Sequence, residues 1–236
     1  MKLIAILCIL LLNACANSPV SKYPIPDRPD KTSINQLAKA DFDRMADMEL
    51  ESNTQSLRTL MMKLYKRNPL ELAKSNVDSA EKMTASVFDE AAKHQWRFSQ
   101  LQNKQDVEAI FLAFDPHYQH DRVLAFIVGL QTMLAKAHNN KTSFYLTDTL
   151  DPQHIYNAAR NIEIAAWKLS NSRDANGNLY LLTNEINEKD RNLSFEREFG
   201  KMIGRTDFYA IALAEKSQRL ISRIAQSLAS AVFLPF

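Results

Sequence analysis

Apolar residues recur every three or four positions along most of the chain, which is the repeat of an amphipathic α-helix. This pattern predicts helices over residues 33–67, 78–94, 152–169 and 194–232, with a shorter apolar run over 106–114. Two interruptions remain open. The polar residues 49–55 form either a bend or a solvated stretch, and the last helix allows a bend near 204–207. The first helix is expected to end before Pro69, because a proline disfavours the helical conformation of the residue before it.

Residues 121–138 form the most apolar helical stretch and leave almost no polar face. A helix that is apolar all round is either buried on every side or spans a membrane. Only about twelve of its residues are apolar, against the ~20 that a bilayer requires. Arg122, Gln131 and Lys136 also interrupt the run. We therefore expect a buried central helix around which the other helices pack.

Two short stretches, residues 142–146 and 179–183, have the composition of β-strands and are bounded by turn residues. They form either one small parallel pair around the helix from Pro152 or no sheet at all. Asp151 is expected to cap that helix, with Pro152 in its first turn. Residues 174–178 contain the dipeptide Asn176-Gly177 and predict a turn.

The composition favours an all-α fold. Only 4 of the 236 residues are glycine, whereas tight hairpins and phosphate-binding loops depend on glycine. The charges are nearly balanced, with 29 Lys and Arg against 27 Asp and Glu. No basic field is therefore present that would bind nucleic acid. We expect residues 33–236 to form one multi-helix globular domain, with at most one minor two-stranded β element.

The N-terminus carries a lysine, then the apolar run of residues 3–12, then Asn13, Ala14 and Cys15. The run has the length of a signal-peptide core and is too short to span a membrane. Leu12-Asn13-Ala14-Cys15 resembles the lipobox of bacterial lipoproteins, although Asn13 departs from the residue usual at its position. The resemblance implies that residues 1–14 are a signal peptide and that Cys15 carries palmitate or a similar acyl chain. An ordinary secretory signal and an uncleaved anchor are the alternatives.

Cleavage after residue 14 would also remove Cys8, so Cys15 would be the only cysteine left and no disulfide framework is expected. Residues 18–32 hold four of the eight prolines among Ser, Lys and Asp, a composition typical of an extended tether. Residues 15–32 are therefore expected to be an acylated cysteine and a flexible tether. Ala16 stands where lipoproteins retained in the inner membrane carry aspartate. The resemblance thus favours the outer membrane, with the domain facing the periplasm.

His117 and His120 form the only histidine cluster of the sequence, with Asp115 and Asp121 beside them. The set lacks a third ligand at a spacing diagnostic of zinc. We expect a polar connection in which the aspartates act as caps, with no metal and no cofactor. The sequence contains no nucleophile elbow, phosphate loop or dinucleotide fingerprint, so no catalytic residue is assigned.

Two further features carry structural expectations. Gly200 and Gly204 fit the pattern G-x-x-x-G, which predicts close helix packing or a helix break in charged surroundings of this kind. The last residues, which end at Phe236, are apolar and are expected to pack on the domain as a hydrophobic tail.

Tyr156, Arg160, Glu163 and Trp167 form a second stripe on the helix from Pro152, beside its apolar face. Arg160 is expected to pair with Glu163 and to stack between the two aromatic rings. Two interpretations are open: the stripe fixes how this helix packs, or it lines a groove for a partner or ligand. These four residues are the candidate functional patch of the sequence.

Four segments together resemble an uncharacterised family of proteobacterial lipoproteins: Lys63-Leu-Tyr-Lys-Arg-Asn-Pro69, Phe114-Asp-Pro-x-Tyr118, Asp121-Arg-Val123 and Tyr156-Asn-Ala-Ala-Arg-Asn161. The resemblance implies a lipidated envelope protein and no catalytic residue. The first functional expectation is a non-catalytic, lipid-anchored domain that binds another envelope protein. The alternatives are a helical pocket for a small or lipidic ligand, and an envelope hydrolase or metalloenzyme whose site carries no motif.

Overall fold

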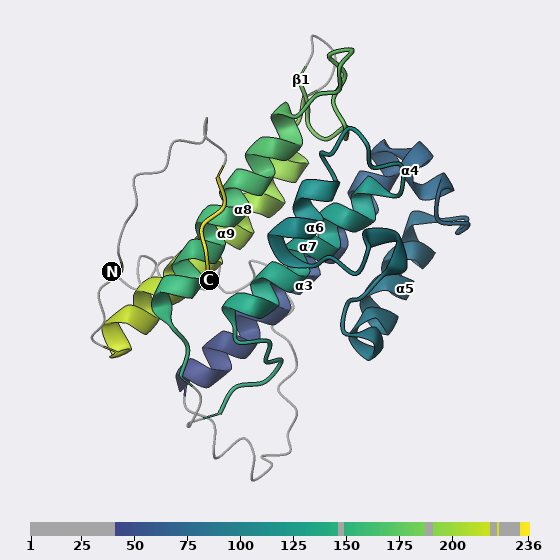
Figure 1. Cartoon of the computed structure of the whole chain (residues 1–236). Coiled ribbons are helices and arrows are strands. Elements are labelled where there is room, and N and C mark those ends of the chain that lie inside the picture. Colours follow the sequence, from purple (N-terminus) through teal and green to yellow (C-terminus); the bar gives the residue numbers. More distant parts are fainter. Residues whose placement is uncertain (1–40, 146–148, 187–190, 218–220, 222–231) are drawn as a thin grey trace, which may run out of the picture. The chain divides into compact units, whose positions relative to one another are not determined.

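The computed structural model describes residues 41–145, 149–186, 191–217, 221 and 232–236. These residues all belong to one compact unit. Its helices are α3 (Asp41–Arg67), α4 (Pro69–Ala73), α5 (Ala80–Glu90), α6 (Asp106–Leu112), α7 (Arg122–Ala137), α8 (Pro152–Asn171) and α9 (Ser194–Ser217) (Figure 1). Two 3-10 turns, η1 (Ala91–His94) and η2 (Ser99–Leu101), and one antiparallel pair, β1 (Glu185–Ile186) and β2 (Arg191–Asn192), complete it. The all-α fold class is confirmed.

Three expectations fall on residues that are not described. The signal peptide of residues 1–14, the acylated Cys15 with its tether to residue 32, and the start of the first helix lie outside the described residues. None of the helices in the described ranges combines the length and the apolar content that crossing a membrane requires.

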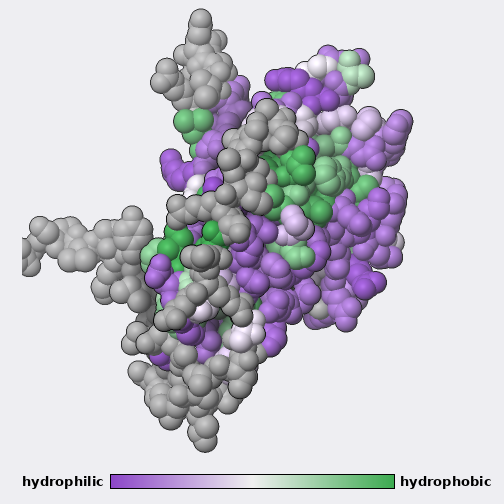
Figure 2. Space-filling view, turned by 60° about the vertical axis from the view of Figure 1, so that its left-hand side comes forward, coloured by the Kyte–Doolittle hydropathy of each residue, from purple (hydrophilic) through white to green (hydrophobic). Residues whose placement is uncertain are grey.

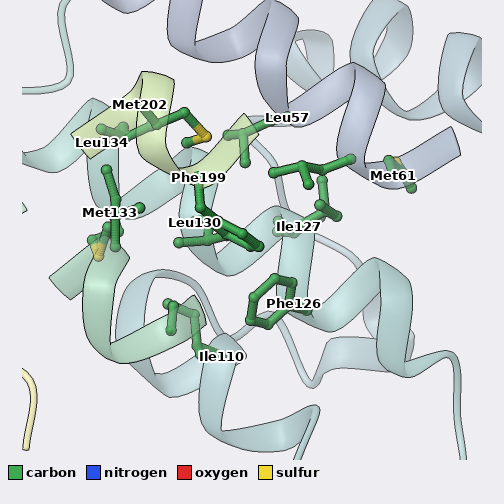
Figure 3. Close-up of a cluster of buried hydrophobic side chains, with 14 of the residues drawn as sticks. Leu57, Met61, Ile110, Phe126, Ile127, Leu130, Met133, Leu134, Phe199 and Met202 are labelled. Carbon is green, nitrogen blue, oxygen red and sulfur yellow. The ribbon is translucent and has the colours of Figure 1, made fainter. Parts of the chain in front are cut away.

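The core is built around α7, as the sequence predicts. Fourteen of its side chains are buried, and α6, α3 and α8 pack against it. Helix α9 packs in turn against α8 and α3. Figure 3 shows side chains of α7 meeting those of α3, α6 and α9 in one apolar cluster. Its labelled members are Leu57, Met61, Ile110, Phe126, Ile127, Leu130, Met133, Leu134, Phe199 and Met202.

Local signals set several helix ends as expected. Helix α3 ends at Arg67, and Asn68 leaves the helical region with φ −125° and ψ 66° before Pro69. Asp151 caps α8, because its Oδ1 accepts a hydrogen bond from the Gln153 amide at 2.9 Å. Gly177 has a φ of +83° in the predicted turn, a conformation that glycine adopts without steric cost.

The polar interval at residues 49–55 contains no bend, and only one side of it is solvated. Helix α3 runs through it without a break. Glu51 and Gln55 are exposed, whereas Glu49 and Asn53 are only 5% and 0% exposed. The burial of these two was not predicted, because their partners Arg205 and Thr206 come from the distant helix α9.

Other expectations also need correction. Residues 142–145 form no strand, and Leu179 makes only an isolated bridge with Arg173, so the parallel pair is wrong.

Helix α9 passes through 204–207 without a break, and Ile221 and Val232 are not helical. A Cβ built on Gly200 or Gly204 would meet no atom within 4 Å, so neither glycine serves close packing. The repeat of apolar residues continues beyond Ser217, but such a repeat does not show at which residue a helix ends.

Gly129 is the glycine that close packing requires. A Cβ at this position of α7 would lie 2.5 Å from Ile110 Cγ1 and 2.7 Å from the Ile110 backbone nitrogen. Only hydrogen fits in that space, so Gly129 sets how closely α6 approaches α7.

Gly129→Ala should therefore lower the free energy of unfolding by about 1–3 kcal/mol, because the new methyl group meets backbone that cannot rotate away. Gly200→Ala is the matched control. It should raise the free energy of unfolding by about 0.5–1 kcal/mol, since its surroundings are open and alanine favours the helix. Denaturant midpoints of the two variants measure both effects. A stable Gly129→Ala variant would contradict the close approach of α6.

Candidate functional site

The stripe on α8 forms an ion pair that joins two helices. Arg160 Nη1 lies 3.1 Å from Glu163 Oε1, and the guanidinium carbon lies 5.1 Å from the centre of the Tyr156 ring, both as expected. Arg160 Nη2 also pairs with Asp207 Oδ2 of α9. The Arg160 side chain is only 18% exposed. Burial raises the pKa of Glu163, although the Arg160 charge opposes that rise.

Two details of the stripe differ from the expectation. Trp167 is half-buried but does not stack on Arg160 among the described contacts. Asp207 was not predicted as a member, because no sequence spacing indicates which residue of α9 faces Arg160. The arrangement favours the structural interpretation of the stripe, because the positive charge of Arg160 pairs with Asp207 and so joins α8 to α9.

A second polar row on α8, formed by Asn157 and Asn161 and called here the amide row, holds the last five residues of the sequence. Asn161 uses both ends of its amide on Leu234: Nδ2 donates to the carbonyl at 2.9 Å, and Oδ1 accepts from the backbone N–H at 2.6 Å. Asn157 Nδ2 donates to the Pro235 carbonyl at 2.7 Å. The expected packing of the apolar tail on the domain is therefore confirmed. Two asparagines four residues apart in a buried helix were the available sequence signal, and it was missed.

Aromatic contacts flank this amide row. The Phe233 ring meets Phe111 edge to face, with centres 5.3 Å apart. The Phe236 ring meets His154 in the same way at 6.3 Å, and Lys136 Nζ lies 5.7 Å from its centre. Phe111 stays 47% exposed despite this contact. Figure 1 shows the tail, in yellow, running along α8.

A hollow of about 560 Å³ opens beside Phe111. We call it the basic hollow, because three cationic side chains line it against two carboxylates. Its cations are Lys104, Lys168 and Arg173, and its carboxylates are Glu108 and Asp115. Phe111 and Tyr180 supply aromatic walls. Such a lining suits a ligand that carries a negatively charged group next to an apolar group.

Lys168 is the most unusual charge of the basic hollow. Its Nζ lies 5.3 Å from the centre of the Phe111 ring, and burial lowers the pKa of its ammonium group. Among the described residues, no carboxylate pairs with it. A half-buried cation without a counter-charge is unfavourable by itself and is improved by any anion that reaches it.

A second hollow, of about 840 Å³, shares Lys104 and Glu108 with the basic hollow and is bordered by strained backbone. A left-handed φ costs a residue other than glycine about 1–2 kcal/mol. The lining residues that adopt it are Gln95, Trp96, Asn103, Asp106 and Asn140. The Asp106 conformation is held by Thr132, whose Oγ1 accepts from the Asp106 amide at 2.6 Å. It is held further by Lys136, which pairs with the Asp106 carboxylate at 2.7 Å.

The histidine cluster does not form a metal site in the described part of the chain. His117 and His120 are both exposed, and no group of three or more suitable ligands occurs among the described residues. Asp121 instead caps α7 by accepting from the Leu124 amide at 3.0 Å, and it accepts from the Tyr65 hydroxyl at 2.6 Å. Burial raises the pKa of Asp121 to about 6, against these hydrogen bonds, which lower it.

A buried contact between Glu49 and His138 lies at the other end of α7. Glu49 Oε2 and His138 Nε2 are 3.0 Å apart, and Thr206 and Asn53 each donate to Glu49 Oε1 at 2.5 Å. His138 Nδ1 faces the Leu134 carbonyl at 2.9 Å and therefore carries a proton, since a carbonyl only accepts. This cluster ties three helices together and lines neither hollow.

Several large apolar side chains of the described residues are exposed. Figure 2 shows one larger apolar area and several smaller ones on a face that is otherwise largely hydrophilic. Of the described large apolar residues, Leu70, Phe208 and Met48 are the most exposed, at 79%, 66% and 65%.

No protein family, curated protein or solved structure matches this chain.

Arg160→Ala should lower the free energy of unfolding by about 1–3 kcal/mol, because it leaves Glu163 and Asp207 without their shared cation. Lys201→Ala removes an exposed cation that pairs with Glu198 at 2.8 Å and serves as the control. It should change the free energy of unfolding by at most about 0.5 kcal/mol. Denaturant midpoints measure both. Equal midpoints for Arg160→Ala and the unmodified protein would favour a functional surface over a structural pair.

Proposed function

We propose that this chain is a lipid-anchored protein of the bacterial cell envelope whose helical domain binds another envelope protein and catalyses no reaction. The anchor is Cys15, behind the apolar run of residues 3–12. The location is the outer membrane, with the domain facing the periplasm. The partner presents an anionic group to the basic hollow.

The observation that carries the interaction role is the unpaired charge of Lys168 in an accessible hollow. Two buried carboxylates of the described residues are engaged inside the domain: Glu49 meets His138, and Asp121 accepts from Tyr65. Lys168 instead combines partial burial and a lowered pKa with a position in a hollow that solvent reaches. A carboxylate from a partner would supply the missing counter-charge and restore the pKa of Lys168 toward its ordinary value.

The composition supports a protein as the partner. With 29 basic and 27 acidic residues, the chain has no extended positive field that would hold a nucleic acid. The basic hollow is small and local, and Phe111 and Tyr180 give it an apolar wall. A partner protein can present an acidic side chain to the cations of the basic hollow and a neighbouring apolar side chain to its aromatic wall.

Cys15→Ser should abolish acylation and release the protein from membranes, because the thiol is the attachment site of the anchor. Incorporation of labelled palmitate and the distribution between membrane and soluble fractions measure the effect. Cys8→Ser is the matched control and should leave both unchanged, since residue 8 belongs to the expected signal peptide. Continued palmitate incorporation by Cys15→Ser would overturn the anchor assignment.

Photocrosslinking in cells tests the basic hollow. Glu108 is exposed at its rim, and p-benzoylphenylalanine at this position should give one discrete protein adduct. Lys168→Glu in the same chain should reduce the adduct at least about tenfold, because it replaces an attraction by a repulsion, whereas Lys168→Arg should preserve it. Lys66→Glu reverses a charge on α3 outside the hollow and should have no effect. An adduct that is insensitive to Lys168→Glu, or no adduct at all, would contradict the proposal.

A further inference from the structure

The amide row on α8 has the properties of a peptide-binding groove. Its polar contacts with the tail all go to backbone groups, which any extended segment carries: the N–H and carbonyl of Leu234 and the carbonyl of Pro235. The groups that make these contacts are side chains of a rigid helix. Asn161 and Asn157 are only 0% and 6% exposed.

One of the two groove amides, that of Asn157, has a partner outside the tail. Asn157 Oδ1 accepts a hydrogen bond from Gln153 Nε2 at 2.8 Å, which orients the Asn157 amide so that its Nδ2 faces outward. Gln153, Asn157 and Asn161 follow one another at intervals of four residues and therefore lie on one face of α8. Such pre-organisation lowers the cost of binding an extended segment.

The tail lies at the surface of the domain, above the two buried asparagines. Val232 is 62% exposed and Pro235 is exposed, while Phe111, the aromatic partner of Phe233, is still 47% exposed. The contacts of the tail include three backbone hydrogen bonds, two aromatic edges and the contact of Lys136 with the Phe236 ring. Phe233 and Phe236 also pack against the core. A segment held in this way can be replaced by another segment that makes the same contacts.

The direction of the tail links the groove to the basic hollow. Pro235 contacts Asn157, Leu234 contacts Asn161, and Phe233 contacts Phe111, so the tail runs antiparallel to α8. Residues that precede the Phe233 position therefore point toward the C-terminal end of α8. Lys168 lies there, and its Nζ is 5.3 Å from the centre of the Phe111 ring.

We propose that α8 carries a docking groove for an extended peptide segment of a partner protein, which residues 232–236 occupy within the chain itself. The partner segment has two apolar residues, preferably aromatic, three positions apart, at the places of Phe233 and Phe236. Acidic residues precede the first of them and reach Lys168. Only this acidic part rests on the function proposed above.

The test uses a chain that lacks residues 232–236 and a fluorescent peptide of sequence Val-Phe-Leu-Pro-Phe. The peptide should bind the shortened chain at least about tenfold more tightly than the full chain, because the full chain fills its own groove. A peptide N-methylated at its leucine should bind at least about tenfold more weakly, since it cannot donate to Asn161 Oδ1. This comparison changes the ligand and leaves the fold of the protein untouched.

Two variants of the shortened chain complete the test. Asn161→Ala should abolish binding of the peptide, whereas Asn171→Ala should not, since Asn171 is an exposed asparagine of the same helix that faces the Trp167 carbonyl. Equal affinity of the full and shortened chains, or equal affinity for the N-methylated peptide, would overturn the groove. Loss of the helical circular dichroism spectrum on shortening would also overturn it, because the tail would then be part of the core.

The acidic part has a separate readout. Two aspartates placed before the valine should tighten binding several-fold relative to two lysines, and Lys168→Ala should remove that difference. Equal affinity of the two peptides, with binding that still depends on Asn161, would refute the role of the basic hollow and leave the groove in place.

Discussion

The need to cover a helix that is apolar on every side governs the arrangement of this domain. Helix α7 buries all but two of its sixteen side chains, which is favourable only when neighbouring helices exclude water from all directions. Helices α3, α6 and α8 supply this cover, and α9 adds Phe199, whose ring meets that of Phe126. Gly129 lets α6 come close enough to complete it.

The ends of α7 are fixed by polar contacts from a single neighbour. Helix α3 places Tyr65 against Asp121 at one end of α7 and Glu49 against His138 at the other. At 1.5 Å per residue, the two α3 residues are about 24 Å apart and the two α7 end residues about 26 Å apart. The nearly equal spacings allow both contacts to form in one antiparallel register. A shift of α3 by one turn would take Tyr65 from Asp121 and His138 from Glu49. The low dielectric of the core makes the loss of a partner costly for a buried carboxylate.

Helix α8 has a different role, because it connects the core to the surface. One side of it packs on α7, Arg160 holds α9 through Asp207, and Asn157 and Asn161 hold an extended segment. Lys168 lies near its end and faces the basic hollow. The residues named in the two proposals thus occur on the helix that contacts both the core and the surface. Because they belong to one helix, the amides and the cation keep fixed positions relative to each other, which would favour the proposed binding of a peptide.

The sequence by itself determined the features that depend on neighbours within a few residues. These are the helical class, the buried nature of α7, the caps Asp121 and Asp151, the end of α3 before Pro69 and the turn at Gly177. Each follows from a local rule of backbone geometry or from the period of apolar residues. The pairing of Arg160 with Glu163 belongs to the same group, since one helical turn separates them.

Only the tertiary structure decided which distant residues meet. The burial of Glu49 and Asn53 depends on Arg205 and Thr206 of α9, and the second partner of Arg160 is Asp207 of the same helix. The apolar stretches at 142–146 and 179–183 had the composition of strands, but no neighbouring backbone offers them a ladder in the described residues. Likewise, Lys168 became a candidate for recognition only when the fold placed it beside Phe111 without a carboxylate. Contacts between residues far apart in sequence depend on how helices cross, and no local pattern in the chain records that geometry.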